Sequence, residues 1–138
     1  MEASEKLALF LGMLCGDGCL SVMHDGKGFR HYPIDFYNTN ENIVKLFDSL
    51  FFCLFGVHGR ISSRVRTNRK RIFEFRKHSK EIVSEITSLG FPEGVKRDVL
   101  RIPEIIKNGT QEEKLIFLYG FIITDGNLKE TKLSFHLG

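Results

Sequence analysis

Two aspartates close two similar nine-residue segments of this sequence, Phe10 to Gly18 and Leu118 to Gly126. Each segment ends in Asp-Gly, at Asp17 and at Asp125, and each carries small residues four positions apart. That spacing places the small residues on one face of a helix, so that two such helices could pack closely. If the helices run parallel, both carboxylates meet at carbonyl-rich C-terminal ends, where the helix dipole disfavours negative charge. The arrangement predicts a binding site for a cation.

Hard oxygen ligands of this kind suit Mg²⁺ better than zinc. A metal held between two carboxylates can activate water and stabilise the leaving oxygen in phosphodiester hydrolysis. For either segment alone, a core helix with small packing residues and a solvated aspartate would explain the pattern. Its repetition, together with the basic segment described next, favours the metal site. The residues expected at the helix interface are Gly12, Gly16, Gly120 and Thr124.

Positive charge is concentrated between His58 and His78, where Glu74 is the single acidic residue. Alternation over residues 57–66 predicts a strand with one face in the core and one basic face, paired with a strand over 70–77. Such a ribbon fits the major groove of DNA, where Arg can bind guanine and other cations hold phosphates. A solvated edge strand is the plainer alternative. The residues expected to contact DNA are Arg60, Ser62, Arg64, Arg66, Arg69, Lys70, Arg71 and Arg76, with His31, Asp35 and Tyr37 from an earlier hairpin.

The elements that must position these side chains follow from periodicity and from turn and cap residues. Ser4 is expected to cap the first helix and Gly18 to stop it in the left-handed conformation. After a looser stretch, Thr110 and Glu113 form a capping box that opens the helix of the second segment. The expected elements are a helix over 4–17, a hairpin over 19–38, a helix over 41–55, a hairpin over 57–77 and a helix over 80–89.

These elements predict one α+β protein in αββαββα order with an antiparallel sheet. The first unit covers residues 1–114, and residues 115–138 hold the second helix and the start of an incomplete second unit. Three cysteines without a Cys-x-x-Cys pair argue against a disulfide framework and against structural zinc. The apolar stretches are too short or too interrupted to cross a bilayer, and no leader is apparent, so an intracellular protein without a membrane partner is expected.

The twin segments and the αββαββα order resemble the LAGLIDADG homing endonucleases. In that family the motif helices form the central interface, their terminal acidic residues bind the catalytic metals, and the sheets form a saddle over double-stranded DNA. The resemblance implies that Asp17 and Asp125 bind Mg²⁺, with the backbone carbonyls of Gly16 and Thr124 completing the ligation.

The resemblance implies further catalytic residues. The stretch over residues 89–96, with Ile102 and Pro103, is similar to the segment before the second motif, where a lysine assists near the scissile phosphate; this indicates Lys96. A polar residue at the end of the second strand organises active-site water in the family, which indicates Asn38 or Asn40. Both motifs depart from the consensus at its first acidic position, held here by Cys15 and Ile123.

The residues after Gly126 suffice for one short strand, over 132–137, and not for a second sheet. A missing C-terminal half or a homodimer would supply the second half-saddle. The function expected is a sequence-specific, metal-dependent DNA endonuclease of intron or intein mobility, or a fragment of one. The alternatives are a DNA-binding regulator that does not cleave and an intron maturase that binds RNA.

Overall fold

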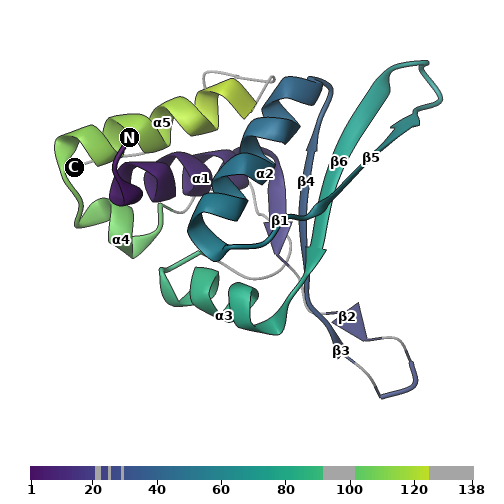
Figure 1. Ribbon diagram of the computed structural model, residues 1–138, viewed down its shortest axis with the longest axis horizontal. Coiled ribbons are helices and arrows are strands. Elements are labelled where there is room, and N and C mark those ends of the chain that lie inside the picture. Colours follow the sequence, from purple (N-terminus) through teal and green to yellow (C-terminus); the bar gives the residue numbers. More distant parts are fainter. Residues whose placement is uncertain (21–22, 25, 29, 92–101, 125–138) are drawn as a thin grey trace.

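The fold is α+β, with the helices gathered on one face of an antiparallel sheet (Figure 1). The computed structural model describes residues 1–20, 23–24, 26–28, 30–91 and 102–124. The elements are α1 (Ala3–Asp17), β1 (Gly18–Leu20), β2 (Met23–His24), β3 (Arg30–His31), β4 (Pro33–Asn38), α2 (Glu41–Phe55), β5 (Arg60–Val65), β6 (Arg71–His78), α3 (Lys80–Ser88), α4 (Glu104–Lys107) and α5 (Gln111–Thr124). This confirms the predicted fold class and the second motif helix. The strand expected over 132–137 lies outside the described residues.

The main sheet has four strands in the order β1-β4-β6-β5, and every neighbouring pair is antiparallel. The expected first hairpin is present but divided, because β1 pairs with β4 while β2 and β3 form a separate ribbon. Both pairings keep one register, with Leu20 opposite Ile34 and Met23 opposite His31. Pro33 starts β4 at the division, where its missing N–H leaves the ladder one donor short.

Aromatic side chains hold the helices against the sheet. Phe47 of α2 stacks on Phe36 of β4, with ring centroids 4.2 Å apart, and meets Phe75 of β6 edge-on at 4.9 Å. Phe10 of α1 stacks on the same Phe47 ring at 4.9 Å. All four rings are fully buried. Since β1 begins directly after α1, this packing fixes the C-terminal end of α1 at the edge of the sheet.

Helix α1 ends at Asp17 as expected, but both expected caps were wrong. Gly18 is extended, with φ −101° and ψ 170°, because the chain passes from the helix straight into β1. A glycine is still required there, since a Cβ would lie 2.8 Å from the carbonyl oxygen of Leu14. Ser4 lies inside the helix; Glu2 is the N-cap, and its N–H donates to Oε1 of Glu5 at 3.0 Å.

The expectation that one face of β5 lies in the core was also wrong. Every residue of β5 is exposed, including Ile61 and Val65, because β5 is an edge strand whose hairpin with β6 extends beyond the helical layer (Figure 1). Helix α4 was not expected, since a four-residue helix is too short to show a period. The expected capping box is present, with Thr110 and Glu113 each accepting the other's N–H. Among the described helices, none has the length and hydrophobicity needed to span a bilayer.

Candidate metal and nucleic-acid site

Helices α1 and α5 meet backbone to backbone through their small residues. A Cβ at Gly12 would lie 2.1 Å from the carbonyl oxygen of Phe117, and one at Gly120 would lie 2.6 Å from that of Leu9. Further along, a Cβ at Gly16 would lie 1.8 Å from Oγ1 of Thr124. From Gly12 to Gly16 along α1, the facing residue advances from Phe117 to Thr124 along α5. The helices run parallel, and their C-terminal ends lie together.

At this shared end the structure brings together Asp17, Asn38 and Thr124. Nδ2 of Asn38, the last residue of β4, donates to Oδ2 of Asp17 at 2.7 Å and to the carbonyl oxygen of Thr124 at 3.4 Å. Oδ1 of Asn38 accepts the N–H of Asn40 at 2.8 Å, which fixes the amide with its donor toward Asp17. Asn38 thus ties the sheet to both motif helices.

These groups line one open surface pocket with the tip of the β5–β6 hairpin. Neither helix has a basic residue in its last turn, the end at which the helix dipole favours positive charge. The cations in the pocket, Arg66 and Lys70, come from the hairpin instead. The pocket is lined by Asp17, Tyr37, Asn38, Thr39, Arg66, Asn68, Lys70, Ile72, Ile123 and Thr124.

Two expected catalytic residues, Asp125 and Lys96, lie outside the described residues. In the part that is described, no three His, Cys, Asp or Glu side chains gather as a metal cluster. The described oxygen groups at the helix ends are the Asp17 carboxylate and the Thr124 carbonyl, which both accept from Nδ2 of Asn38. Hard oxygen groups of this kind fit Mg²⁺ or another hard divalent cation rather than zinc.

Asn40, the second residue expected to organise water, has a different position. It is the N-cap of α2, where its side chain accepts the N–H of Asn42 at 2.9 Å, and it is exposed. Of the two candidates, Asn38 is the one that contacts Asp17.

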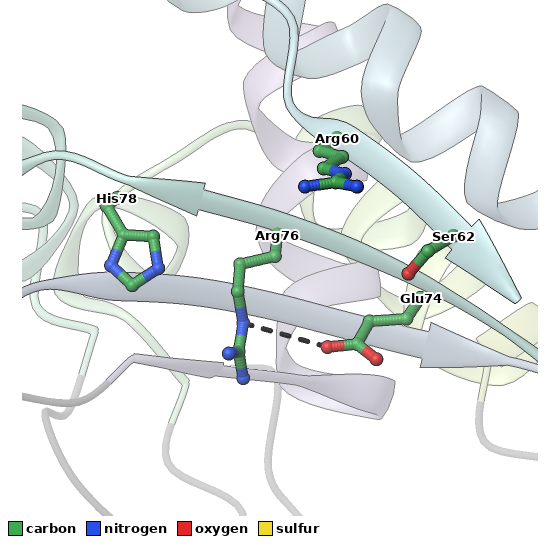
Figure 2. Close-up of a pocket in the computed structure, with 5 residues that line it drawn as sticks. All are labelled: Arg60, Ser62, Glu74, Arg76 and His78. Atoms are coloured by element: carbon green, nitrogen blue, oxygen red, sulfur yellow. Dashed lines mark ion pairs between the residues drawn. The ribbon is translucent and has the colours of Figure 1, made fainter. Parts of the chain in front are cut away.

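Across the open face of the sheet, away from the helices, strand register sets side chains in rows. One row holds Asp35, Arg76 and Arg60, and the next holds Tyr37, Glu74 and Ser62. Figure 2 shows a pocket on this face, lined by Arg60, Ser62, Glu74, Arg76 and His78. Sequence reasoning missed Glu74 and His78 as surface residues of this site, although their alternation with Arg76 along β6 could have indicated them.

The other basic residues of the hairpin divide between the two faces and the tip. By alternation, Arg64 lies on the same face as Arg60, whereas Arg71 lies on the opposite face and donates to Oγ of Ser63 at 2.9 Å. The tip is a tight turn in which the N–H of Arg69 donates to the carbonyl of Arg66, and Arg69 itself has φ 64°. His31 lies at the other end of the sheet, with its ring 6.1 Å from that of His78.

Asp35, expected to contact bases, is directed at Arg76 instead. Nε of Arg76 donates to Oδ1 of Asp35 at 2.5 Å, and Asp35 is only 6% exposed. This hydrogen bond raises the pKa of Arg76 above its ordinary value. The pKa of Tyr37 is also raised, chiefly by burial and then by the negative charges of Asp35 and Glu74.

No protein-family model matches the chain. Among curated proteins, an A-type ATP synthase subunit of Pyrococcus abyssi is 29% identical over 128 residues, which are 93% of this chain and 11% of that protein. The DNA polymerase of Thermococcus kodakarensis is 27% identical over 134 residues, which are 96% of this chain and 7% of that protein. The chain therefore spans a small part of each relative.

Solved structures of the homing endonuclease I-DmoI share the fold. Its mesophilic variants align with a TM-score of 0.65 and 22% identity, over 90% of this chain and 63% of theirs. I-DmoI in complex with DNA and Ca aligns with a TM-score of 0.66 and 21% identity, over 92% and 60%. Its complex with DNA and Mn aligns with a TM-score of 0.63 and 20% identity, over 89% and 63%. The chain spans less than two thirds of these structures.

Proposed function

Since the chain has the fold of the LAGLIDADG homing endonucleases, we propose that it is a metal-dependent endonuclease that cuts double-stranded DNA at a specific sequence. The observation that carries the proposal is the placement of Asp17. Its carboxylate lies at the joint C-terminal end of two parallel helices, hydrogen-bonded to Asn38, in a pocket shared with Arg66 and Lys70. A carboxylate and two cations in one open pocket suit a metal and a phosphate together.

In this proposal Asp17 and Asp125 bind Mg²⁺ with the backbone carbonyls of Gly16 and Thr124. The bound metal would supply an activated water and stabilise the leaving oxygen. Asn38 holds the Asp17 carboxylate in place through its 2.7 Å hydrogen bond. Lys96 is proposed to act near the scissile phosphate.

The proposed DNA contacts divide by position. Arg66, Arg69 and Lys70 at the hairpin tip bind the phosphate backbone, because they are exposed cations beside the Asp17 pocket. The open face of the sheet lies against the bases, with Arg60, Ser62 and Arg64 on one strand. Solved complexes of I-DmoI with DNA and with Ca or Mn support both the nucleic acid and the divalent cation.

The two curated relatives support a role in mobility. A segment similar to nearly the whole of this chain occurs within an ATP synthase protein and within a DNA polymerase, as a small fraction of each. ATP synthesis and DNA polymerisation are different reactions, and neither explains why the two proteins share a segment of this size. An element that inserts itself into unrelated genes would produce this distribution, as inteins and introns do.

The test compares the full chain with Asp17→Asn. DNA that the chain retains from a randomised double-stranded library in Ca²⁺ is isolated and then incubated with Mg²⁺. We expect cleavage by the unchanged chain and none by Asp17→Asn, with similar DNA affinity, because the substitution removes a metal ligand and leaves the sheet intact. The control is Glu85→Gln, an exposed carboxylate on α3.

Equal cutting by Asp17→Asn would exclude the proposed metal site. Binding without nicking by the unchanged chain in Mg²⁺ would instead support a DNA-binding regulator on the same fold. Preferential retention of RNA over DNA would support the maturase.

A further inference from the structure

The distribution of charge differs between the tip of the β5–β6 hairpin and the middle of the sheet. The tip is purely positive, with Arg66, Arg69 and Lys70 and no acidic residue in the sequence from 60 to 73. The middle of the sheet is balanced, because Arg60 and Arg76 lie beside Asp35 and Glu74. A surface that only attracts the phosphate backbone gains nothing from those two carboxylates.

The guanidinium group of Arg76 contacts two carboxylates through its Nε atom. Its Nε donates to the buried Asp35 and lies 3.6 Å from Oε1 of Glu74. Figure 2 shows the remaining nitrogens of the group pointing away from Glu74. The Arg76 side chain is 42% exposed, whereas that of Asp35 is 9% exposed. The anchor is therefore buried while part of the arginine remains open to solvent.

If it served only to stabilise the fold, this arrangement of Arg60, Arg76 and Asp35 would cost free energy. Arg60 stands directly opposite Arg76 on the neighbouring strand, and like charges in that position destabilise a sheet. Burying the Asp35 carboxylate adds a desolvation cost that only its pairing offsets. An edge hairpin needs charge to prevent aggregation, but it does not need an arginine fixed by a buried acid.

We propose that Arg76 recognises a guanine in the major groove of the DNA bound by the sheet, and that Asp35 is the positioning residue that aims it. The inference rests on the proposed DNA-binding function. The two Nη atoms of arginine match O6 and N7 of guanine, which is the commonest specific contact in the major groove. With Nε already fixed on Asp35, little side-chain freedom is lost when that contact forms.

The hairpin tip provides the contrast. Arg66 and Lys70 have no buried acid beside them among the described contacts and are suited to phosphates, which carry no sequence information. The two groups of residues therefore leave different signatures. Loss of a phosphate contact weakens binding to all sequences and reduces the salt dependence, whereas loss of a base contact relaxes one position of the site.

The experiment selects double-stranded DNA from a randomised library with the full chain in Ca²⁺, and compares the recovered sequences for five proteins. We expect a preference for G·C at one position with the unchanged chain, reduced roughly five- to 150-fold in Arg76→Lys, which lacks the planar fork. Asp35→Asn should lose preference at that same position. Arg66→Ala should keep the preference but lower the slope of log affinity against log salt by about one. Lys45→Arg on α2 is the matched control.

An Arg76→Lys protein that keeps every base preference would overturn the inference while leaving DNA binding intact. Asp35→Asn would overturn the positioning role if it weakened all sequences equally and lowered the thermal midpoint, since that result marks a purely structural ion pair. A chain that retains no DNA in Ca²⁺ would remove both this inference and the proposed function. Because cleavage is not measured, failure of the metal site alone leaves the result unaffected.

Discussion

Asn38 joins three parts of the molecule through one amide group. It accepts from Asn40 in the turn before α2, donates to Asp17 at the end of α1 and reaches the carbonyl of Thr124 at the end of α5. In the proposed metal site, Asn38 would fix the orientation of the ligand Asp17, and loss of such a partner commonly costs metal affinity or activity. The position of Asn38 therefore predicts a kinetic effect without a DNA-binding effect.

We expect Asn38→Ala to slow cleavage by roughly 10- to 100-fold with unchanged DNA affinity. Single-turnover cleavage in Mg²⁺ and equilibrium binding in Ca²⁺ measure the two quantities separately. Asn42→Ala, in the first turn of α2, is the control, since Asn42 is exposed and donates its backbone N–H, which alanine keeps, to Asn40. Cleavage at the unchanged rate would show that Asp17 does not need this partner.

The raised pKa of Tyr37 predicts that the stability of the folded protein decreases at alkaline pH. Its pKa is raised above 10.0 by burial and by the charges of Asp35 and Glu74, so the folded protein holds the phenolic proton more tightly than the unfolded chain. The stability from this group is therefore fully present below pH 10.0 and is lost as pH rises through the folded pKa. Thermal midpoints of the unchanged chain should fall more steeply above that pH than those of Tyr37→Phe. Tyr119→Phe, on an exposed side chain, should behave like the unchanged chain.

The sequence predicts the site residues only where their positions follow from spacing within one helix or strand. Asp17 and Thr124 follow from the repeated segments, because a helix fixes where its last turn lies. The choice between Asn38 and Asn40 depends on how the turn after β4 folds, and spacing alone does not decide it. The pairing of Asp35 with Arg76 joins residues far apart in the chain, through a register that no local pattern specifies.

At the scale of elements, the close contact between α1 and α5 depends on glycine residues, which have no side chain. A Cβ at Gly12 would lie 2.1 Å from the carbonyl oxygen of Phe117, a backbone atom of a helix with little freedom to move. We expect Gly12→Ala to lower the free energy of unfolding by about 1–3 kcal/mol, as overpacking does in other cores. Denaturant unfolding followed by circular dichroism measures the change.

Ser49→Ala is the control for that prediction, because Ser49 is an exposed position on α2, where alanine favours the helix. A Gly12→Ala protein as stable as Ser49→Ala would show that the two helices can separate at no cost. Close packing would then not be what holds their C-terminal ends together.

The elements themselves were largely accessible from the sequence, and the exceptions have physical causes. Helices α2 and α3 follow from apolar period and from the caps Asn40 and Ser79, which are local signals. The exposure of β5 was not accessible, since alternation predicts a buried face only where another layer covers it. Ile61 and Val65 alternate correctly but lie beyond the helices.

At the scale of the whole molecule, the boundary expected between residues 114 and 115 separates two repeated units and remains a prediction. The hydrophobic core extends across this boundary. Phe117 and Phe121 of α5 belong to the same buried cluster as Leu9 and Met13 of α1 and Phe36 of β4. The motif helix that opens the second unit thus completes the core of the first. Stability of the sheet should therefore depend on α5.

Phe117→Ala tests whether α5 and the sheet unfold as one unit. Phe117 is fully buried against α1, so its truncation should cost about 3–5 kcal/mol. If the core is shared, hydrogen exchange of the β4 and β6 amides should accelerate by the same free energy as that of α5. Tyr119→Ala, on the same helix but 60% exposed, should leave both unchanged. Exchange that accelerates in α5 alone would mean that the sheet folds independently, and that the proposed metal site lies where two separately stable units dock.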